Sequence, residues 1–450
     1  MADGTGLANH TFDELRQGLE NRIEHVVTAA DLAAWSTLTD GAAPGLAAGA
    51  LVAALIGRRL PGAGSVVRRQ SFSFDAPVRP GDRLAITATV RNKESSGLVL
   101  LDCRCTNQLG LTVLEGEVEV LAPERRRRAP ELPEPVPAPR RHEKYERLVA
   151  LTREIPAMPT VVAHPCDETS LRAALEATAS GIIEPVLVAP LGKLRAIAAA
   201  SGLSLEGIEL VDAPHSHAAA EKAVELVRAG RGELLMKGSL HSDELLSAVT
   251  ARETGLRTER RLSHVFIMDV PTYPEPLFIT DAAVNIFPDL EAKRDIVQNA
   301  IDLHRGLGLG EPRVAILSAV ETVTPKIPGT IDAAALCKMA DRGQIEGGLL
   351  DGPLALDNAI SLEAARMKKI RSRVAGRAQI LVVPDLEAGN MLAKNLSFLA
   401  GADAAGVVLG ARVPIVLTSR ADKLRARMAS CAVAALYAHH RRGHQPVAAE

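Results

Sequence analysis

The sequence predicts an α+β domain followed by a larger α/β domain, and three observations support that division. Between residues 60 and 122, apolar and polar residues alternate with the period of antiparallel strands. From residue 144 onward, continuous apolar strands alternate with helical segments, which is typical of a mainly parallel sheet covered by helices. The stretch between them, residues 123–143, holds four consecutive arginines and then five prolines, which favour an extended, solvated linker.

The first domain, residues 1–122, is predicted to wrap a sheet around one long helix. Residues 46–56 form an all-apolar helix with no polar face, so we expect it to be covered on all sides. Strands with alternating apolar residues follow it, and such half-buried strands pair as antiparallel neighbours. They are predicted at residues 66–74, 83–95, 98–108 and 111–121, and with the helix they make a hot-dog arrangement.

Residues 60–84 resemble the MaoC-like hydratase branch of the hot-dog fold, particularly in the sequence PVRPGD at 77–82, and the likeness covers roughly residues 22–122. Membership of that branch would imply an aspartate and a histidine that add water to an enoyl thioester. Here no histidine occurs between His25 and His142. Because imidazole is the best proton carrier for such a reaction, we expect a non-catalytic module that binds CoA or mediates oligomerisation. A bifunctional hydratase and transferase is the alternative.

The second domain, residues 144–450, is predicted to be a two-sided α/β domain. Its strands are long and apolar, and helical segments fill most of the gaps between them, as in parallel sheets with helical crossovers. About ten strands are enough for two lobes with a cleft between them. The strands are predicted at residues 160–164, 185–190, 207–212, 233–238, 264–270, 277–285, 313–319, 379–384, 405–410 and 413–419.

Polar loops follow or separate these predicted elements, and each combines glycine or proline with charged or hydroxyl groups. In open α/β sheets, ligands gather at the carboxyl ends of strands, so these loops predict a crevice lined with cations and hydrogen-bond donors. The loops are residues 236–242, 255–258, 324–330, 351–357, 384–390 and 414–422.

The sequences LMKGSLHSDELL, GLRT, DGPLALDNAIS, VAGRAQILVVPDLEAGN and PIVLTSRAD resemble the phosphate acetyltransferase and phosphate butyryltransferase family over roughly residues 144–445. Their wording looks closer to the butyryl branch. The resemblance implies a two-lobed α/β fold similar to isocitrate and isopropylmalate dehydrogenases, commonly a dimer. It also implies an enzyme that interconverts acyl-CoA plus phosphate with acyl phosphate plus CoA, for acyl groups from acetyl to butyryl. CoA is then a substrate, and no cofactor is expected.

The chemistry of that reaction agrees with the residues in the loops. A tetrahedral oxyanion forms beside a phosphate dianion, so the site needs cations and hydrogen-bond donors that point toward these two negative groups. The family's Ser-Arg pair is matched by Ser419 and Arg420. Arg420 is predicted to grip phosphate through its two-pronged guanidinium, and Ser419 to donate to the oxyanion or to the departing thiolate. The other predicted substrate-binding residues are Lys237, His241, Arg257 and Lys326 as cations or donors, Asp351 and Asn390 as loop-orienting groups, and Asp422.

One position departs from the family pattern. In the acetyl branch an aspartate proposed as the base for the CoA thiol follows the arginine by six residues, and here that position is Ala426. Asp422 is nearer to the pair, but its different spacing leaves its role open. Because a thiol has a pKa of about 8.5, some thiolate exists at neutral pH without a base. The general base is therefore left unassigned.

Composition argues against nucleic-acid and membrane partners. The formal net charge is −2 and aromatic residues make up 2% of the chain, so there is neither a basic footprint nor a set of stacking platforms. No apolar run reaches the ~18 residues of a membrane helix, and the amino terminus lacks the pattern of a signal peptide. We expect a cytoplasmic homo-oligomer, a dimer or larger.

Nucleotide and metal motifs are also missing from the sequence. There is no P-loop sequence, and GLGLG at 306–310 ends a helix before a strand, whereas a dinucleotide loop follows a strand and opens a helix. The five cysteines are widely spread without a C-x-x-C pair, which indicates reduced thiols. No cluster has metal-ligand spacing, so no metal is expected.

Overall fold

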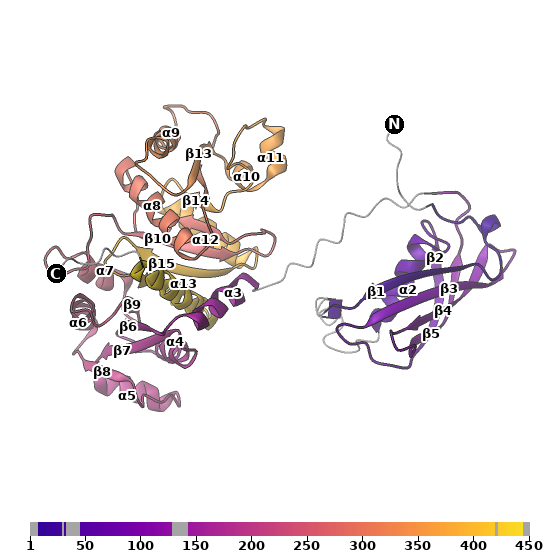
Figure 1. Cartoon of the computed structure of the whole chain (residues 1–450), viewed down its shortest axis with the longest axis horizontal. Helices are drawn as coiled ribbons and strands as arrows, with labels where there is room; N and C mark the ends of the chain where they lie inside the picture. Colours follow the sequence, from indigo (N-terminus) through magenta and orange to yellow (C-terminus); the bar gives the residue numbers. More distant parts are fainter. Residues whose placement is uncertain (1–7, 29–30, 33–45, 128–142, 419–421, 444–450) are drawn as a thin grey trace. The chain divides into compact units, whose positions relative to one another are not determined.

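The computed structural model describes residues 8–28, 31–32, 46–127, 143–418 and 422–443. The chain divides into two compact units, Met1–Arg140 and Arg141–Glu450. In Figure 1 the first unit is drawn in indigo and purple, and the second from the purple of α3 through magenta and orange to yellow. Residues 128–142, most of the predicted linker, lie outside the described residues.

The first unit is a five-stranded antiparallel sheet packed on one helix. Its strands follow the order β1-β3-β4-β5-β2, and every neighbouring pair is antiparallel. The helix buries Val52, Leu55 and Ile56 against apolar residues of the sheet. This is the expected hot-dog arrangement. The elements are η1 Phe12–Glu14, β1 Glu20–Val26, α2 Leu46–Arg58, β2 Val66–Phe74, β3 Arg83–Lys93, β4 Leu98–Thr106 and β5 Thr112–Leu121.

Two expectations for this unit are wrong in detail. Helix α2 is not covered on all sides, because the sheet packs on one face only and Ala50, Ala53 and Gly57 are exposed. Strand β2 is not half-buried. It lies at the edge of the sheet, and eight of its nine residues are exposed.

Cys103 and Cys105 of β4 both point into the core of the first unit, as their spacing predicts. Burial raises the pKa of Cys103 to about 12 and that of Cys105 to about 11. Both thiols therefore stay protonated at neutral pH and act as small packing residues.

A single mixed sheet of eleven strands runs through the second unit, in the order β13-β12-β14-β11-β10-β15-β16-β9-β6-β7-β8. This confirms the predicted α/β class. The strands are β6 Met158–Ala163, β7 Ile183–Ala189, β8 Glu209–Asp212, β9 Leu234–Lys237, β10 Ser263–Asp269, β11 Leu277–Thr280, β12 Arg313–Leu317, β13 Leu349–Leu354, β14 Ile380–Val382, β15 Asp403–Leu409 and β16 Ile415–Val416.

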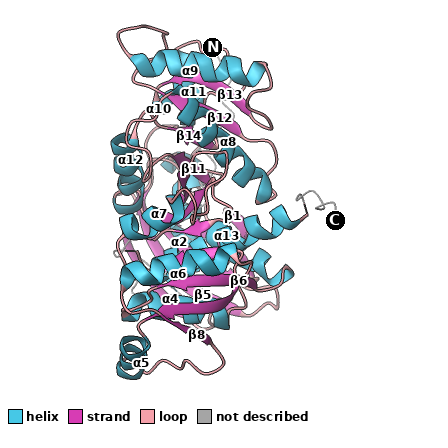
Figure 2. Ribbon diagram, turned by 90° about the vertical axis from the view of Figure 1, so that its left-hand side faces the viewer, coloured by secondary structure: helices cyan, strands magenta, loops and turns pink. Residues whose placement is uncertain are grey.

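Helices cover both faces of this sheet (Figures 1 and 2). One face carries α3 Glu143–Leu151, α4 Glu168–Ala179, α5 Leu191–Ala200, α8 Leu290–Gly306, α9 Pro328–Asp341 and α13 Leu424–Arg442. The other carries α6 Ser216–Arg228, α7 Ser242–Thr250, α10 Leu356–Ile360, α11 Leu362–Met367 and α12 Leu386–Phe398.

Helix α13 has ten buried residues between Arg427 and Ala438. It packs on β15 and also contacts α3, α4 and α8. Its small residues, such as Ala432 and Ala435, allow this close approach. The helix therefore joins the two halves of the sheet.

The strands reverse direction in the middle of the sheet. Strands β6, β7, β8, β9 and β16 are parallel to one another. Strands β11, β12, β13 and β14 are also mutually parallel. Because β10 and β15 are joined to their neighbours by antiparallel pairings only, the two sets run in opposite directions. Their carboxyl ends therefore lie at opposite edges of the sheet.

Some strand boundaries differ from the prediction. Strand β13 falls partly on residues 351–357, which were expected to be a loop. Strand β11 ends at Thr280, so residues 281–285 form a loop instead of continuing the strand. The glycines after α8 act as the expected helix stop, since Gly308 and Gly310 have positive φ and β12 follows.

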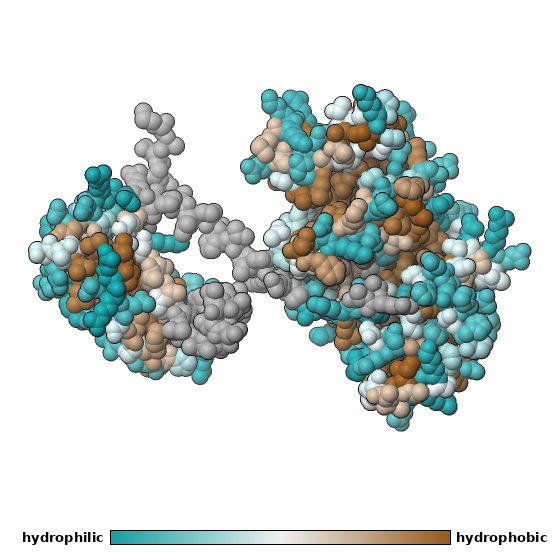
Figure 3. Space-filling view, turned by 180° about the vertical axis from the view of Figure 1, so that it is seen from behind, coloured by the Kyte–Doolittle hydropathy of each residue, from teal (hydrophilic) through white to brown (hydrophobic). Residues whose placement is uncertain are grey.

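The surface of the second unit mixes polar and apolar side chains, and brown apolar groups lie among teal hydrophilic ones in Figure 3. None of the helices within the described ranges has both the length and the apolar character needed to cross a bilayer.

Candidate active site

The carboxyl ends of three parallel strands, β6, β9 and β16, meet at one edge of the sheet. In β9, Met236 pairs with Val162 of β6 on one side and with Val416 of β16 on the other. Lys237, one residue further on, pairs with Ala163. The segments that leave these strands are therefore neighbours, and we call this place the β9 edge.

Gly238 brings the first two of these segments into direct contact. A Cβ atom at this position would lie 2.4 Å from the carbonyl oxygen of His164 and 2.5 Å from that of Ala163. The backbone N–H of Gly238 donates to the Ala163 carbonyl at 2.8 Å, and that of Ser239 donates to the His164 carbonyl at 2.9 Å. Only glycine fits so close to another backbone.

Lys237 is buried at the end of β9, with 4% of its surface exposed. Its ammonium donates to the carbonyl of Leu240 at 3.0 Å and lies 3.4 Å from that of Gly238. These contacts fix a positive charge under the loop that follows the strand. The predicted cation is thus held by the backbone rather than exposed at the surface.

The Ser239 hydroxyl defines the tautomer of His164. It donates to the His164 carbonyl at 2.9 Å, and it accepts from the Cys166 N–H at 3.2 Å. Nδ1 of His164 lies 3.1 Å from the same oxygen. Since the hydroxyl proton is already used, Nδ1 must carry the proton in this bond and Nε2 keeps its lone pair.

His164 is 8% exposed and has the left-handed φ of +54°. Burial and then the positive charge of Lys193 lower the pKa of its imidazole, against the opposing charges of Glu244 and Asp167. The ring is therefore neutral at neutral pH. It provides a hydrogen-bond acceptor directly after Ala163, the residue of β6 that pairs with Lys237.

Arg427 on α13 braces the segment that leaves β16. Its guanidinium is 4% exposed, donates through Nη1 to the Thr418 hydroxyl at 3.0 Å, and donates through Nε to the Asp422 carbonyl at 3.3 Å. These two contacts lie on either side of residues 419–421. The first turn of α13 thus fixes both ends of that segment.

Ser419 and Arg420, the predicted catalytic pair, lie outside the described residues. Their neighbours Thr418 and Asp422 are described, and Asp422 is half-buried. The register of β16 places the start of the segment at the β9 edge.

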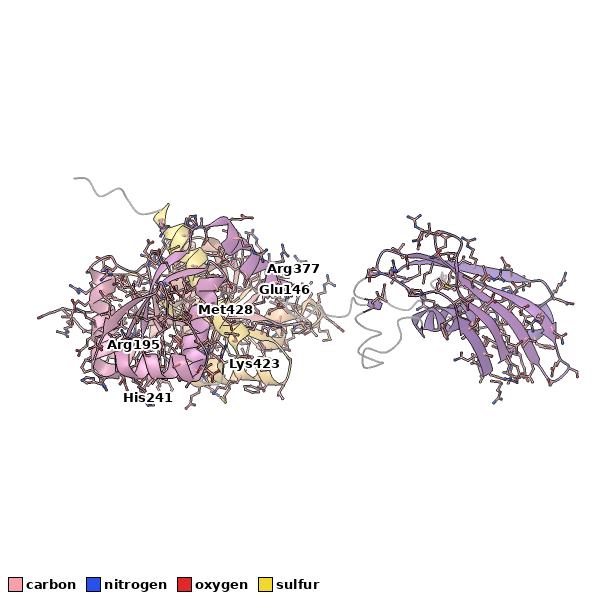
Figure 4. The ribbon with its side chains drawn as sticks, turned by 90° about the horizontal axis from the view of Figure 1, so that it is seen from below. Glu146, Arg195, His241, Arg377, Lys423 and Met428 are labelled. Carbon is pink, nitrogen blue, oxygen red and sulfur yellow. The ribbon has the colours of Figure 1, made fainter. Side chains whose placement is uncertain are left out.

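His241 lies close to this edge in sequence but is exposed to solvent. It is the N-cap residue of α7, and its side chain makes no capping hydrogen bond there. Figure 4 shows the residue at the margin of the unit. Its place suits contact with a ligand at the rim of the edge.

The remaining predicted residues do not join this group. Arg257 is exposed beside Ala411, before β10 begins. Lys326 is exposed in the loop after β12. Asp351 lies on β13, where its side chain accepts from the Gly352 N–H at 2.8 Å, and Asn390 of α12 donates to the Ala282 carbonyl at 3.3 Å.

These four residues follow or flank strands whose carboxyl ends lie opposite the β9 edge. Because strand direction reverses at β15, the loops after β12, β13 and β14 leave the sheet at the end opposite to the β9 edge, and the expectation that all the loops line one crevice stays a prediction. The register of β9 and β16 places Lys237 beside the start of the segment that holds Ser419 and Arg420, and Arg427 contacts Asp422 at the far end of that segment.

The β9 edge combines a buried ammonium, a buried guanidinium, hydroxyl groups and a neutral imidazole. Such a set suits an anionic ligand and a reaction in which negative charge develops on oxygen. Within the ranges that the structure covers, no group of three or more His, Cys, Asp or Glu is placed to hold a metal ion.

Sequence reasoning did not single out His164 or Arg427, and it placed Ser239 and Thr418 in predicted loops without giving either residue a role. His164 ends the predicted strand TVVAH, so its position after a strand was a usable signal. Arg427 directly follows Ala426, but a helical arginine gives no sign in sequence that it is buried. Its role depends on the contact between α13 and β16.

Comparisons with known proteins point to one family. The family described as phosphate acetyl/butaryl transferase matches residues 214–435. A phosphate acetyltransferase of Rhizobium meliloti is 71% identical over 311 residues, which cover 69% of this chain and 98% of that protein. A phosphate butyryltransferase of Clostridium acetobutylicum is 42% identical over 272 residues, or 60% of this chain and 90% of that protein.

A solved structure agrees with these relatives. The crystal structure of a branched-chain phosphotransacylase from Enterococcus faecalis V583 matches with a TM-score of 0.56 and 30% identity. The match covers 63% of this chain and 100% of that one. The second unit thus has the fold of that enzyme.

Proposed function

The chain belongs to the phosphate acetyl/butyryltransferase family and is a phosphate acyltransferase, and from this premise we propose that its reaction takes place at the β9 edge. The family resemblance read from the loop sequences is thereby confirmed. The enzyme interconverts acyl-CoA plus phosphate with acyl phosphate plus CoA. The pairing of Met236 with Val416, which sets the end of β16 beside Lys237, carries the proposal.

In the proposed mechanism a phosphate oxygen attacks the thioester carbonyl of acyl-CoA. The C–O bond forms, the carbonyl oxygen becomes an oxyanion, and the C–S bond then breaks to release the CoA thiolate. Arg420 binds two phosphate oxygens, and Ser419 donates to the oxyanion or to the thiolate. Lys237 adds a fixed positive charge below the loop, and Asp422 belongs to the same segment as the pair.

Much of the rate enhancement comes from holding both substrates in position. Proximity alone contributes about 7–11 kcal/mol to such a two-substrate step. We propose that Arg427 keeps the segment after β16 in the conformation that this positioning needs. His241 is proposed to contact substrate at the rim, whereas Arg257, Lys326, Asp351 and Asn390 stay predictions without an assigned contact to the reacting atoms.

We propose acetyl-CoA as the preferred substrate within the acetyl to butyryl range. The loop sequences resembled the butyryl branch more closely, but the overall sequence identities favour the acetyl branch. The Rhizobium meliloti acetyltransferase is 71% identical, against 42% for the Clostridium acetobutylicum butyryltransferase. The proposed setting is a cytoplasmic homo-oligomer with acyl-CoA and phosphate as its small-molecule partners.

A panel of acyl donors tests both function and preference. Phosphate-dependent release of free CoA thiol is measured with acetyl-, propionyl- and butyryl-CoA at equal concentrations. We expect release with all three and the highest kcat/KM with acetyl-CoA. Absence of release with every donor would remove the proposed function, and a higher value for butyryl-CoA would reverse the proposed preference.

For the first unit we propose a non-catalytic role, as a module for CoA binding or oligomerisation. The observation behind it is the absence of histidine from residues 26–141. His25 itself is paired with Asp31 at 3.1 Å. Crotonyl-CoA hydration, followed by loss of the enoyl absorbance, is expected to be absent. Turnover of crotonyl-CoA would favour the bifunctional alternative.

A further inference from the structure

His164 is the first residue after strand β6, and its backbone makes three hydrogen bonds. Its N–H donates to the Val188 carbonyl of β7 at 2.8 Å, and its carbonyl accepts from the Ser239 N–H at 2.9 Å and from the Cys166 N–H at 2.8 Å. Its φ of +54° lies in the left-handed region, which non-glycine residues rarely adopt. Such conformations are concentrated at active sites. The backbone contacts therefore hold His164 in a conformation that is typical of functional residues.

The Nε2 atom of His164 is open to solvent. The tautomer set by Ser239 leaves a lone pair on this nitrogen, which makes no hydrogen bond to any residue that the structure describes. Within the same ranges, the buried side-chain atoms without a partner belong to Glu244, His264 and Asn358. The unpaired Nε2 of His164 is therefore not buried, and a ligand at the β9 edge can reach it.

The charged groups that act on the ring of His164 come from three helices. Burial and then the positive charge of Lys193 on α5 lower the pKa of the imidazole. Glu244 of α7 and Asp167, the N-cap residue of α4, oppose this effect with negative charges. Burial raises the pKa of the nearby Cys166 thiol to about 11, so this group is neutral. The ring is thus ready to accept a proton, and two carboxylates stabilise the imidazolium that forms.

Two other histidines are buried in the described part of the chain, and both lie in the core. Nδ1 of His264 is buried without a partner, and a Cβ atom added to Gly406 would lie 2.9 Å from its Nε2. The ring of His304 packs on Phe278, with 5.1 Å between the ring centroids. Of the three buried histidines, His164 is therefore the one that lies at the β9 edge.

We propose that His164 is the general base and general acid of acyl transfer, acting through Nε2. This inference rests on the function proposed above, and it supplies the proton carrier that Ala426 cannot provide at its position. The physical support is the accessible lone pair, the tautomer that Ser239 fixes, and the place of His164 directly after a strand of the β9 edge.

The proton returns to solution phosphate or to CoA in every turnover. When acyl-CoA is formed, the thiol S–H bond breaks and Nε2 takes the proton. The thiolate then forms the C–S bond, the C–O bond to phosphate breaks, and the imidazolium gives its proton to the departing phosphate. In the opposite direction, Nε2 takes the proton from hydrogen phosphate as its oxygen attacks the thioester. The imidazolium then protonates the departing thiolate.

The variant His164→Asn removes Nε2 and keeps the local contacts. The amide N–H of asparagine can replace Nδ1–H in the bond to Ser239, and asparagine tolerates a left-handed φ. Formation of acetyl-CoA from acetyl phosphate and CoA is followed through the absorbance of the thioester bond. At about pH 7 we expect kcat/KM for CoA to fall at least about a hundredfold.

The dependence on pH separates a lost base from a damaged site. Because the pKa of His164 is lowered, the parent keeps its base form from about pH 7 to about 8.5, and its kcat/KM should vary less than about threefold. Without the base, the rate depends on the CoA thiolate, whose fraction rises from about 3% to about half over this range. The defect of His164→Asn should therefore shrink at least about tenfold.

His215→Asn is the matched control. His215 is exposed at the N-cap of α6, where its Nδ1 accepts from the Ala218 N–H at 3.2 Å, and asparagine is a good N-cap residue. This variant should stay within about twofold of the parent at each pH. A defect of His164→Asn that is below about threefold at about pH 7, or that has the same size at every pH, would overturn the proposal.

The variant His164→Gly gives an independent measurement. Glycine adopts a positive φ without strain, and the lost ring leaves room for free imidazole. After correction for the reaction without enzyme, added imidazole should raise kcat/KM of this variant at least about tenfold and leave the parent unchanged. An unaffected variant would contradict the proposed role. An inactive parent would instead remove the proposed function itself, so the two failures can be told apart.

Discussion

At the scale of single residues, Gly238 fixes the distance between the segments that follow β6 and β9. We predict that Gly238→Ala lowers the free energy of unfolding of the second unit by about 2 kcal/mol, because the added methyl group collides with two backbone carbonyls. Urea unfolding measures this loss. Acyl transfer should fall as well, since the loop that holds Lys237 must move.

Gly192 supplies the control for that substitution. It lies in α5, and a Cβ there would meet no atom within 4 Å. Gly192→Ala should leave stability and activity close to those of the parent protein. An equally tolerated Gly238→Ala would show that the two segments are not in close contact.

The second residue-scale prediction concerns pH and His264. Burial lowers the pKa of His264 to about 4, against the opposing charge of Asp281, while an exposed imidazole has a pKa of about 6.5. Between these two pH values the imidazole of His264 is protonated in the unfolded chain and neutral in the folded chain. The contribution of His264 to the free energy of unfolding is therefore fully present above about pH 6.5, and it is lost as the pH falls toward about 4.

The loss due to His264 should reach about 2 kcal/mol at about pH 5. Urea unfolding at several pH values measures it through tyrosine circular dichroism, because all three tyrosines of the chain lie in the second unit. The variant His264→Leu should show a flatter dependence on pH. An unchanged slope in that variant would assign the acid sensitivity to other groups.

Site residues that follow a local sequence pattern could be predicted, whereas those whose role depends on contacts between distant segments could not. Lys237 was predicted because it is a charged residue at the end of an apolar strand. Arg427 was missed because its contacts with Thr418 and Asp422 depend on how α13 packs against β16. Ser239 was part of a predicted loop, but its bond to His164 joins residues 75 positions apart.

At the scale of elements, strand existence was easier to predict than strand direction. Apolar periodicity located ten of the eleven strands of the second unit, and β13 was missed because Gly352 and Pro353 look like a turn. Periodicity says nothing about whether neighbouring strands are parallel. The reversal at β15, which separates Lys326 and Asn390 from Lys237, could not be read from the sequence.

The contact between α13 and β16 gives the element-scale prediction. Arg427→Met removes the bonds to the Thr418 hydroxyl and the Asp422 carbonyl, and hydrogen bonds of a charged group contribute about 1.5–3 kcal/mol. We expect kcat/KM for phosphate to fall at least about tenfold while far-UV circular dichroism stays the same.

Arg425→Met is the matched control on the same helix. Arg425 is partly exposed and lies 3.8 Å from Asp403 rather than at the β9 edge. Its loss should change kcat/KM by less than about threefold. Equal effects of the two substitutions would show that α13 does not position the segment after β16.

At the scale of the whole molecule, the two units are separate folds with separate cores. The Rhizobium meliloti relative matches 69% of this chain but 98% of its own length. Since that alignment spans 311 residues, the relative has little room for a counterpart of the first unit. The family model matches residues 214–435, which lie in the second unit, and we propose that this unit contains what acyl transfer requires.

Deletion of residues 1–140 tests this independence. We predict that the remaining chain keeps its kcat and its KM for phosphate within about twofold, because no group of the first unit is proposed to reach the reacting atoms. Steady-state assays of the truncated and complete proteins measure both constants. A large rise in KM for acetyl-CoA would instead assign CoA binding to the first unit.

The most direct test of the β9 edge compares two arginine substitutions in one assay. Phosphate-dependent CoA release is measured for Arg420→Ala, at the segment after β16, and for Arg257→Ala, beside the opposite edge. We predict that Arg420→Ala lowers kcat/KM for phosphate at least about a hundredfold, while Arg257→Ala stays within about threefold of the parent. A large loss in Arg257→Ala with an active Arg420→Ala would contradict the proposed site.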